Sequence, residues 1–281
     1  MKKVFIVLSL MVLVGCVNLE KIIGKENKTN SREDEMVALN AQELSINGST
    51  EAEVIETLLS KATYKEAGLN MVSPEEKDKI EILERRAVND YYILSKASKR
   101  VSITPEEVEK VYSENKKDLE GKTLEELTPA IKNLIYEAKL KNEITKLLNE
   151  IEKSNNLTEN QETGEENKKE KAIKMSKAVY EEAVSDMKSP EDKVKLDTLK
   201  RRAVNDYYIL SRANKKIKIT PKEIKKIFDE NKDELNGKTL EEVTPAIENL
   251  IYESKLKDQV MATLNKIKKK YKINNSAKKY I

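Results

Sequence analysis

The chain contains one stretch of sequence twice. The eleven residues RRAVNDYYILS at 85–95 recur unchanged at 201–211, 116 positions further along. At that offset 62–153 aligns with 178–269 without a gap, and 44 of the 70 positions in 84–153 are identical to their counterparts. A unit of about 95 residues has the size of a small domain, and two copies are too few for a stacked array of repeats. The sequence therefore predicts one small fold made twice.

Both copies carry the signals of helices. A Ser or Thr followed three residues later by Glu forms a capping box at a helix start, and proline is favoured at the first helical position. Four such starts lie in the first copy: Thr50 with Glu53, Ser73-Pro74 with Glu76, Thr104-Pro105 with Glu107, and Thr123 with Glu126. Apolar residues then recur every three or four positions, as at Ile80, Leu83, Ala87, Tyr91 and Leu94. We therefore predict an all-α fold with about four helices in each copy.

The N-terminus predicts export. Two lysines precede an apolar run that is interrupted only by Ser9 and is too short to span a bilayer. Cys16, the one cysteine in the sequence, follows Leu-Val-Gly directly, which resembles the lipobox of bacterial lipoproteins. The resemblance implies that 1–15 is a cleaved signal and that Cys16 becomes the lipidated first residue. The alternative is a free thiol near an ordinary signal cleavage site.

Composition predicts how the rest is organised. The polar segment 16–47 is typical of a flexible stalk, and 154–171, with the run SNNLTENQETGEENKKEK, is typical of a linker. We therefore expect two tandem homologous helical domains, 48–153 and 172–281, on a flexible lipidated stalk. Because no disulfide is possible with one cysteine, a packed core must hold each domain together.

The residue types present argue against an enzyme. The sequence has no histidine, one cysteine and seven glycines, which leaves no Ser-His or Cys-His arrangement, none of the usual zinc ligands and no Gly-rich phosphate loop. The pair Glu125-Glu126, repeated as Glu241-Glu242, suggests carboxylate chemistry of the glycosidase type. Helix capping and the helix dipole explain the same acidic residues. We expect no catalytic residue, no metal and no cofactor.

Two interpretations are open for the repeated segment. On a helix its tyrosines can bury their rings in a core and keep their hydroxyl groups in water. One tyrosine of each pair, Tyr91 or Tyr92 and Tyr207 or Tyr208, can instead line a groove that accepts apolar segments of another polypeptide. Both can hold at once, because one side of a helix can be core while another is groove.

The string ITPEEVEKVYSENKKDLEGKTLEELTPAIKNLIYEAKLKNEITKLLNEIEK, with a second copy that ends LNKIKKKYKI, resembles a known module. It is similar to the helical peptide-binding domain of SurA-type and PrsA-type extracytoplasmic foldases, over about 70 residues of each copy. That family often carries a parvulin-type prolyl isomerase domain of about 90 residues. Only seven residues separate Asn115 from Thr123, and 154–171 is also too short to hold such a domain. The resemblance therefore implies the binding of unfolded chains without isomerase activity.

We expect a lipid-anchored protein of the cell envelope, periplasmic or surface-exposed, that binds unfolded or partly folded exported proteins in the manner of a chaperone. The alternative is a structural or adhesive surface lipoprotein that binds one specific envelope or host partner through charged faces. The basic balance of 200–269, with 17 basic and 11 acidic residues, suits anionic lipid, wall polymer or acidic clients, or is a solvated helix surface. Nucleic acid is not an expected partner outside the cytoplasm.

Overall fold

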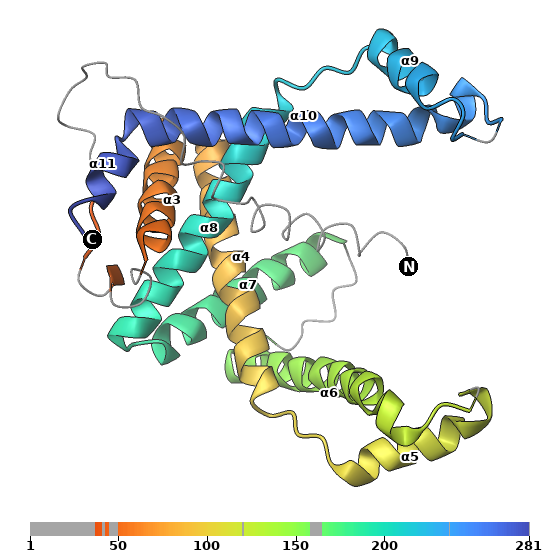
Figure 1. Ribbon diagram of the computed structural model, residues 1–281. Coiled ribbons are helices and arrows are strands. Elements are labelled where there is room, and N and C mark those ends of the chain that lie inside the picture. The colour runs from red at the N-terminus through yellow and green to blue at the C-terminus, as the bar shows by residue number, and fades with distance from the viewer. Residues whose placement is uncertain are drawn as a thin grey trace. The chain divides into compact units, whose positions relative to one another are not determined.

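The computed structural model describes residues 37–40, 43–44, 50–119, 121–157, 165–235 and 237–280. The described residues form helices joined by turns, without any β-strand, which confirms the prediction of an all-α fold (Figure 1). The signal 1–15 and the lipidation residue Cys16 lie outside the described residues.

The helices follow the duplication of the sequence. The first copy contains α3 (Glu51–Asn70), α4 (Pro74–Ser98), α5 (Pro105–Asn115), the short 3-10 helix η3 (Lys116–Asp118) and α6 (Leu124–Ser154). The second contains α7 (Glu165–Asp186), α8 (Pro190–Asn214), α9 (Pro221–Glu230) and α10 (Leu240–Lys270), followed by α11 (Ile273–Ala277). The capping boxes predicted at Thr50, Ser73, Thr104 and Thr123 are confirmed at the starts of α3, α4, α5 and α6. These helix starts are local features, because the cap and its partner lie three residues apart.

Part of the segment 154–171, which was expected to be a linker, is helical. Ser154 is the last residue of α6 and α7 begins at Glu165, so that 165–171 are helical. The Lys171 ammonium lies 2.5 Å from a carboxylate oxygen of Glu152. Glu and Lys are good helix formers, and this run continues directly into an apolar helix face, which explains why its polar composition does not give a loop.

The described part of the predicted stalk is also packed. Leu39 and Glu43 are buried. The Leu39 backbone N–H donates to the Tyr280 hydroxyl at 3.0 Å, and Lys61 donates to Glu43 at 2.8 Å. The prediction of a flexible stalk therefore does not hold for 37–40 and 43–44, because Leu39 is fixed to Tyr280 and Glu43 to Lys61 of α3.

The chain divides into two compact units, 73–203 and a second one made of 1–72 with 204–281. The unit 73–203 holds α4, α5, α6, α7 and the first half of α8, and the other unit holds α3, the rest of α8, α9, α10 and α11. These units do not coincide with the ranges 48–153 and 172–281 expected from the repeat. Each unit combines helices from both copies, because the first helix of each copy packs against the other copy.

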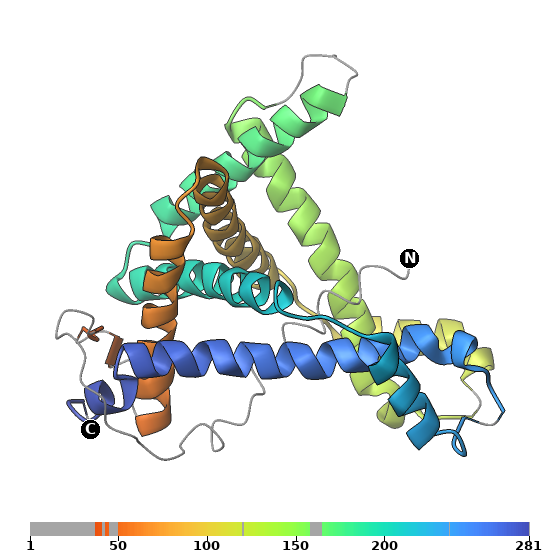
Figure 2. The same cartoon turned by 90° about the horizontal axis from the view of Figure 1, so that it is seen from above.

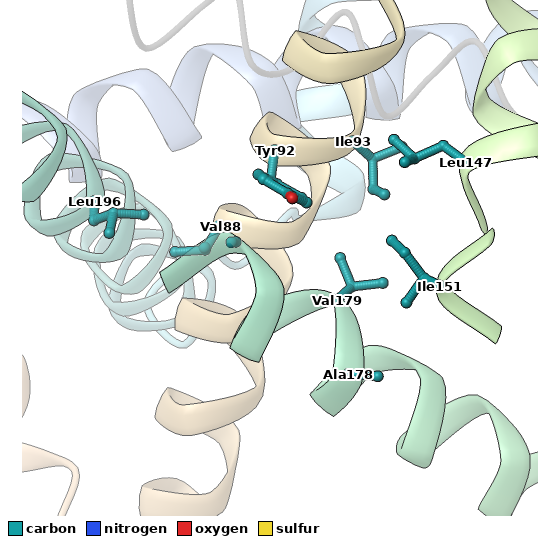
Figure 3. Close-up of a cluster of buried hydrophobic side chains, with 9 residues drawn as sticks. Val88, Tyr92, Ile93, Leu147, Ile151, Ala178, Val179 and Leu196 are labelled. Atoms are coloured by element: carbon teal, nitrogen blue, oxygen red, sulfur yellow. The ribbon is translucent and has the colours of Figure 1, made fainter. Parts of the chain in front are cut away.

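In the unit 73–203 the core lies where α7 meets α4 and α6 (Figure 3). Val88 and Ile93 of α4 face α7 and the end of α6, and Val179 of α7 lies opposite Ile151. Val88 is completely buried, and Leu147 and Ile151 are each 1% exposed. Burying an aliphatic side chain of this kind contributes about 1.5–3 kcal/mol. The buried residues that α7 contributes to this core are Ala178, Val179 and Ala183.

In the other unit α3 crosses α10 beside α11 (Figure 1, Figure 2). Val54, Leu58 and Ala62 on α3 are completely buried, and Tyr271 after the end of α10 is 1% exposed. The Tyr271 hydroxyl donates to the Glu66 carboxylate at 2.8 Å, which fixes the end of α10 to the last turns of α3.

Chain length explains why α3 does not pack on its own α4. On α4 the docked helix α7 runs in the same direction, with Asp186 near its end beside Lys96 near the end of α4. For α3 to replace α7, Asn70, the counterpart of Asp186, would have to reach Lys96. Lys96 lies 22 positions after Pro74, about 33 Å along the helix, whereas the four-residue step from Asn70 to Pro74 spans at most about 14 Å. The first helix of each copy must therefore dock on another copy.

Candidate functional site

The four tyrosines of the repeated segment occupy two kinds of position. Tyr92 and Tyr208 are buried, at 4% and 6% exposure. Tyr91 is half-buried beneath the Lys195 ammonium, which lies 5.0 Å from its ring centre, and Tyr207 is 37% exposed. The core interpretation therefore applies to Tyr92 and Tyr208, because a helix of the other copy covers each of them. Tyr92 and Tyr208 are therefore not open to a client in the described part of the chain, and the groove interpretation stays a prediction for Tyr91 and Tyr207.

The Tyr92 hydroxyl belongs to a polar cluster between α4 and α7. It donates to Asp186 at 2.7 Å and accepts from Lys96 at 2.5 Å. It also lies 2.9 Å from a carboxylate oxygen of Glu182. Lys96 in turn lies 2.6 Å from Asp186 and 3.1 Å from Glu182. A cation between two carboxylates and a hydroxyl satisfies the polar groups at the rim of this core, which fixes α7 in one position along α4.

The pKa values follow from this arrangement. Burial raises the pKa of the Tyr92 hydroxyl, and the two carboxylates beside it act in the same direction. The hydrogen bonds from Lys96 and Tyr92 lower the pKa of Asp186. Burial alone lowers the pKa of Lys96, but its hydrogen bonds to Asp186, Tyr92 and Glu182 outweigh burial and raise it. Tyr92, Lys96 and Asp186 therefore each keep one protonation state around neutral pH, which suits a structural role.

The corresponding place in the second copy is built differently. Burial raises the pKa of Tyr208, whose ring lies under the Arg212 guanidinium at 5.4 Å. Glu66, the counterpart of Glu182, bonds instead to Lys270 at 2.6 Å and to the Tyr271 hydroxyl. Lys270 at the end of α10 and Tyr271 after it thus bind the carboxylate whose counterpart, Glu182, binds Tyr92 and Lys96 in the first copy.

One contact is the same in both copies. The Asn89 side-chain amide donates to the backbone carbonyl of Ser176 at 2.7 Å, and the Asn205 amide donates to that of Ser60 at 2.8 Å. The receiving helices carry SKATYKEA at 60–67 and SKAVYEEA at 176–183, which differ at two positions. The identical segment RRAVNDYYILS is thus a docking surface for a helix of matching sequence, made twice because it accepts a helix twice. Sequence reasoning missed this pairing, although the match of 60–67 with 176–183 was a signal for it.

Two helical hairpins leave apolar side chains uncovered. In the first, α5 packs on the start of α6 around Val108, Ile131 and Ile135. In the second, α9 packs on the start of α10 around a matching cluster, which consists of Ile224, Val243, Ile247 and Ile251. Leu134 is 63% exposed and its counterpart Leu250 is 59% exposed. Because each of these cores is built from two helices in the described part of the chain, it stays open at its edge.

Matching ion pairs and glycine turns stabilise both hairpins. Lys139 pairs with Glu107 and Lys255 pairs with Glu223, each at 2.5 Å. The bond from Lys255 and the backbone N–H of Thr220 lower the pKa of Glu223 to about 2. Gly121 and Gly237 take a φ of 80° in the turns between the hairpin helices, a conformation that favours glycine. The two hairpins are therefore built as rigid copies of one another.

The acidic pairs are helix caps in the structure. Glu126 and Glu242 accept the backbone N–H groups of Thr123 and Thr239, which lowers the pKa of both carboxyl groups. Glu125 and Glu241 are exposed in the first turn of the same helices. In the described part of the chain no group of three or more His, Cys, Asp or Glu residues is placed to hold a metal ion. None of the helices described is both long and apolar enough to cross a membrane.

Comparison of the chain with protein-family models, with curated proteins and with solved structures found no match.

Proposed function

We propose that this protein is a membrane-anchored extracytoplasmic lipoprotein that binds unfolded or partly folded polypeptides, without isomerase activity, and that its two hairpins provide the contact surface. The observation that carries the proposal is the pair Leu134 and Leu250, large apolar side chains that are about 60% exposed at the same place in both copies. The sequence resemblance to foldase peptide-binding domains covers these hairpins.

The exposure of these leucines follows from the geometry of a two-helix layer. Leu134 lies three positions after the buried Ile131, about 60° away around the helix axis. The apolar stripe of α6 is therefore wider than the contact that the 11-residue helix α5 can make. The exposed edge of the stripe can accept an apolar side chain from another polypeptide.

The energy of one such contact is small. Complete burial of a leucine contributes about 1.5–3 kcal/mol, so that covering one that is about 60% exposed contributes about 1–2 kcal/mol. Two equivalent sites in one chain raise the local concentration of the second site once the first is occupied. Weak contacts at two places suit the reversible holding of an unfolded chain.

Aggregation of a denatured client protein tests the proposal. The chain should delay aggregation at a near-stoichiometric ratio, and the variant L134S/L250S should lose at least half of that effect. The matched control is L69S/V72S, because Leu69 and Val72 are 59% and 60% exposed but lie outside the hairpins. Equal losses in the two variants would show that general surface hydrophobicity, and not the hairpins, binds the client. No delay with several clients would exclude the proposed function.

A second candidate is a structural or adhesive surface lipoprotein that binds one partner through charged faces. The burial of Tyr92 and Tyr208 favours it, because it leaves only Tyr91 and Tyr207 for the groove expected at the repeated helix. Salt distinguishes the two functions. Contacts between apolar side chains should persist at about 0.5 M salt, whereas contacts between exposed charges are largely screened there. A single folded partner that is released by salt would support the second candidate.

A further inference from the structure

Exposed lysines are concentrated at the start of the second hairpin. Six lysines lie within 215–226, and all of them are exposed: Lys215, Lys216, Lys218, Lys222, Lys225 and Lys226. The one acidic residue in this stretch, Glu223, is paired with Lys255 on α10. We call this set of six lysines the basic face.

The first copy shows that the fold does not require the basic face. Its corresponding stretch, 99–110, has three basic and three acidic residues. Glu106 stands where the second copy has Lys222, and Glu109 stands where it has Lys225. The buried position between them stays aliphatic, as Val108 in one copy and Ile224 in the other. The same scaffold thus carries a neutral face once and a basic face once.

The lysines of α9 point away from the hairpin core. Lys222 and Lys226 lie about half a turn around the helix from the buried Ile224. The Lys226 ammonium lies 3.7 Å from a carboxylate oxygen of Glu230. The other five lysines have no ion pair with any described residue. A shallow depression of about 410 Å³ lies on this side and is open to solvent; it is lined by Lys222, Lys225, Lys226, Asp229 and Glu230.

We propose that the basic face binds the surface of an anionic lipid bilayer. An open face of separate ammonium groups matches many headgroups spread over a plane, whereas a small anion requires an enclosed site with fixed donors. The stretch 215–226 contains no arginine, asparagine, glutamine or aromatic side chain, which leaves lysine as its main group for contacting bases and none for stacking on them. The second hairpin therefore contacts the bilayer and the first does not, although the two share one fold.

Vesicle binding of the full chain carrying C16S, which cannot be lipidated, tests the proposal. Vesicles of phosphatidylcholine alone measure binding that does not depend on charge, and vesicles with one third phosphatidylglycerol measure the contribution of the basic face. The variant K222E/K225E carries the residues that the first copy has at these positions, so that it should keep the fold. Each lysine near such a surface contributes about fivefold to binding, and the variant should therefore bind anionic vesicles about 25-fold less tightly or weaker.

The control variant is K168E/K169E, which makes the same change of charge at two exposed lysines of α7. It should bind anionic vesicles within about threefold of the parent chain. The proposal is overturned if both variants lose binding equally, or if the parent chain binds neutral and anionic vesicles alike. A competition assay adds double-stranded DNA, polyglutamate or further anionic vesicles to the bound chain, each measured by its concentration of negative charges. The proposal is also overturned if DNA or polyglutamate displaces the chain at a lower concentration than the added vesicles do.

Discussion

The substitution Y92F removes one oxygen atom from the cluster that fixes α7 on α4. The Tyr92 hydroxyl donates to Asp186 at 2.7 Å and accepts from Lys96 at 2.5 Å. A hydrogen bond to a charged group contributes about 1.5–3 kcal/mol when it is buried. The side chains of Lys96 and Asp186 are 35% and 46% exposed, so that water replaces part of what is lost. We expect a loss of about 1–2 kcal/mol in the free energy of unfolding.

The second copy provides the matched control. Tyr208 is buried to a similar degree, but the carboxylate that corresponds to Glu182 bonds to Lys270 and Tyr271 instead. Y208F should therefore cost less than Y92F, because Arg212 is the one charged group that hydrogen-bonds to the Tyr208 hydroxyl among the described residues. Urea unfolding followed by circular dichroism measures both values, and hydrogen exchange should show faster exchange in α7 for Y92F alone. Equal losses for the two variants, or unchanged exchange in α7, would refute the structural role of the cluster.

Two further predictions concern the pH dependence and the hairpin turns. The hydrogen bond from Lys96 lowers the pKa of Asp186, so the stability that this carboxylate contributes is present above its usual pKa of 3.8 and is lost as the pH falls through the lowered value. Urea midpoints should therefore show the parent chain more stable than D186N at pH 6, with a difference that shrinks as the pH falls below 3.8; a difference independent of pH would contradict this. G121A and G237A should each cost about 1 kcal/mol, because both glycines have a φ of 80° while an added Cβ meets no atom within 4 Å; thermal unfolding measures the cost, and an unchanged midpoint would show that the turns relax freely.

The sequence predicted the features that depend on near neighbours. Each capping box joins residues three positions apart, so that helix starts such as Thr104 and Thr123 were visible in the order of residues alone. The placement of charges was also visible, including the reversal from Glu106 to Lys222 that separates the two hairpins.

The features that depend on distant neighbours could not be predicted in the same way. The burial of Tyr92 is due to α7, which lies about 90 positions away, and a helix pattern does not say which helix covers it. Leu39 is packed for the same reason, because its partner Tyr280 lies at the other end of the chain.

The exchange of first helices also depends on chain length. A helix docked on α4 runs parallel to it, as α7 does. The three residues between α3 and α4 are too few to let α3 take that parallel position. This length and the match of 60–67 with 176–183 are both present in the sequence. Their meaning becomes clear only when the direction of α7 along α4 is known.

The exchange is tested most directly by cutting the chain between its copies. A protease site introduced within 158–164 separates a fragment with α3 to α6 from a fragment with α7 to α11. Because each compact unit contains helices from both fragments, the cut protein should still elute from a size-exclusion column as one species with the mass of the whole chain, at micromolar concentration and without denaturant. Elution as two separate folded fragments would contradict the exchange.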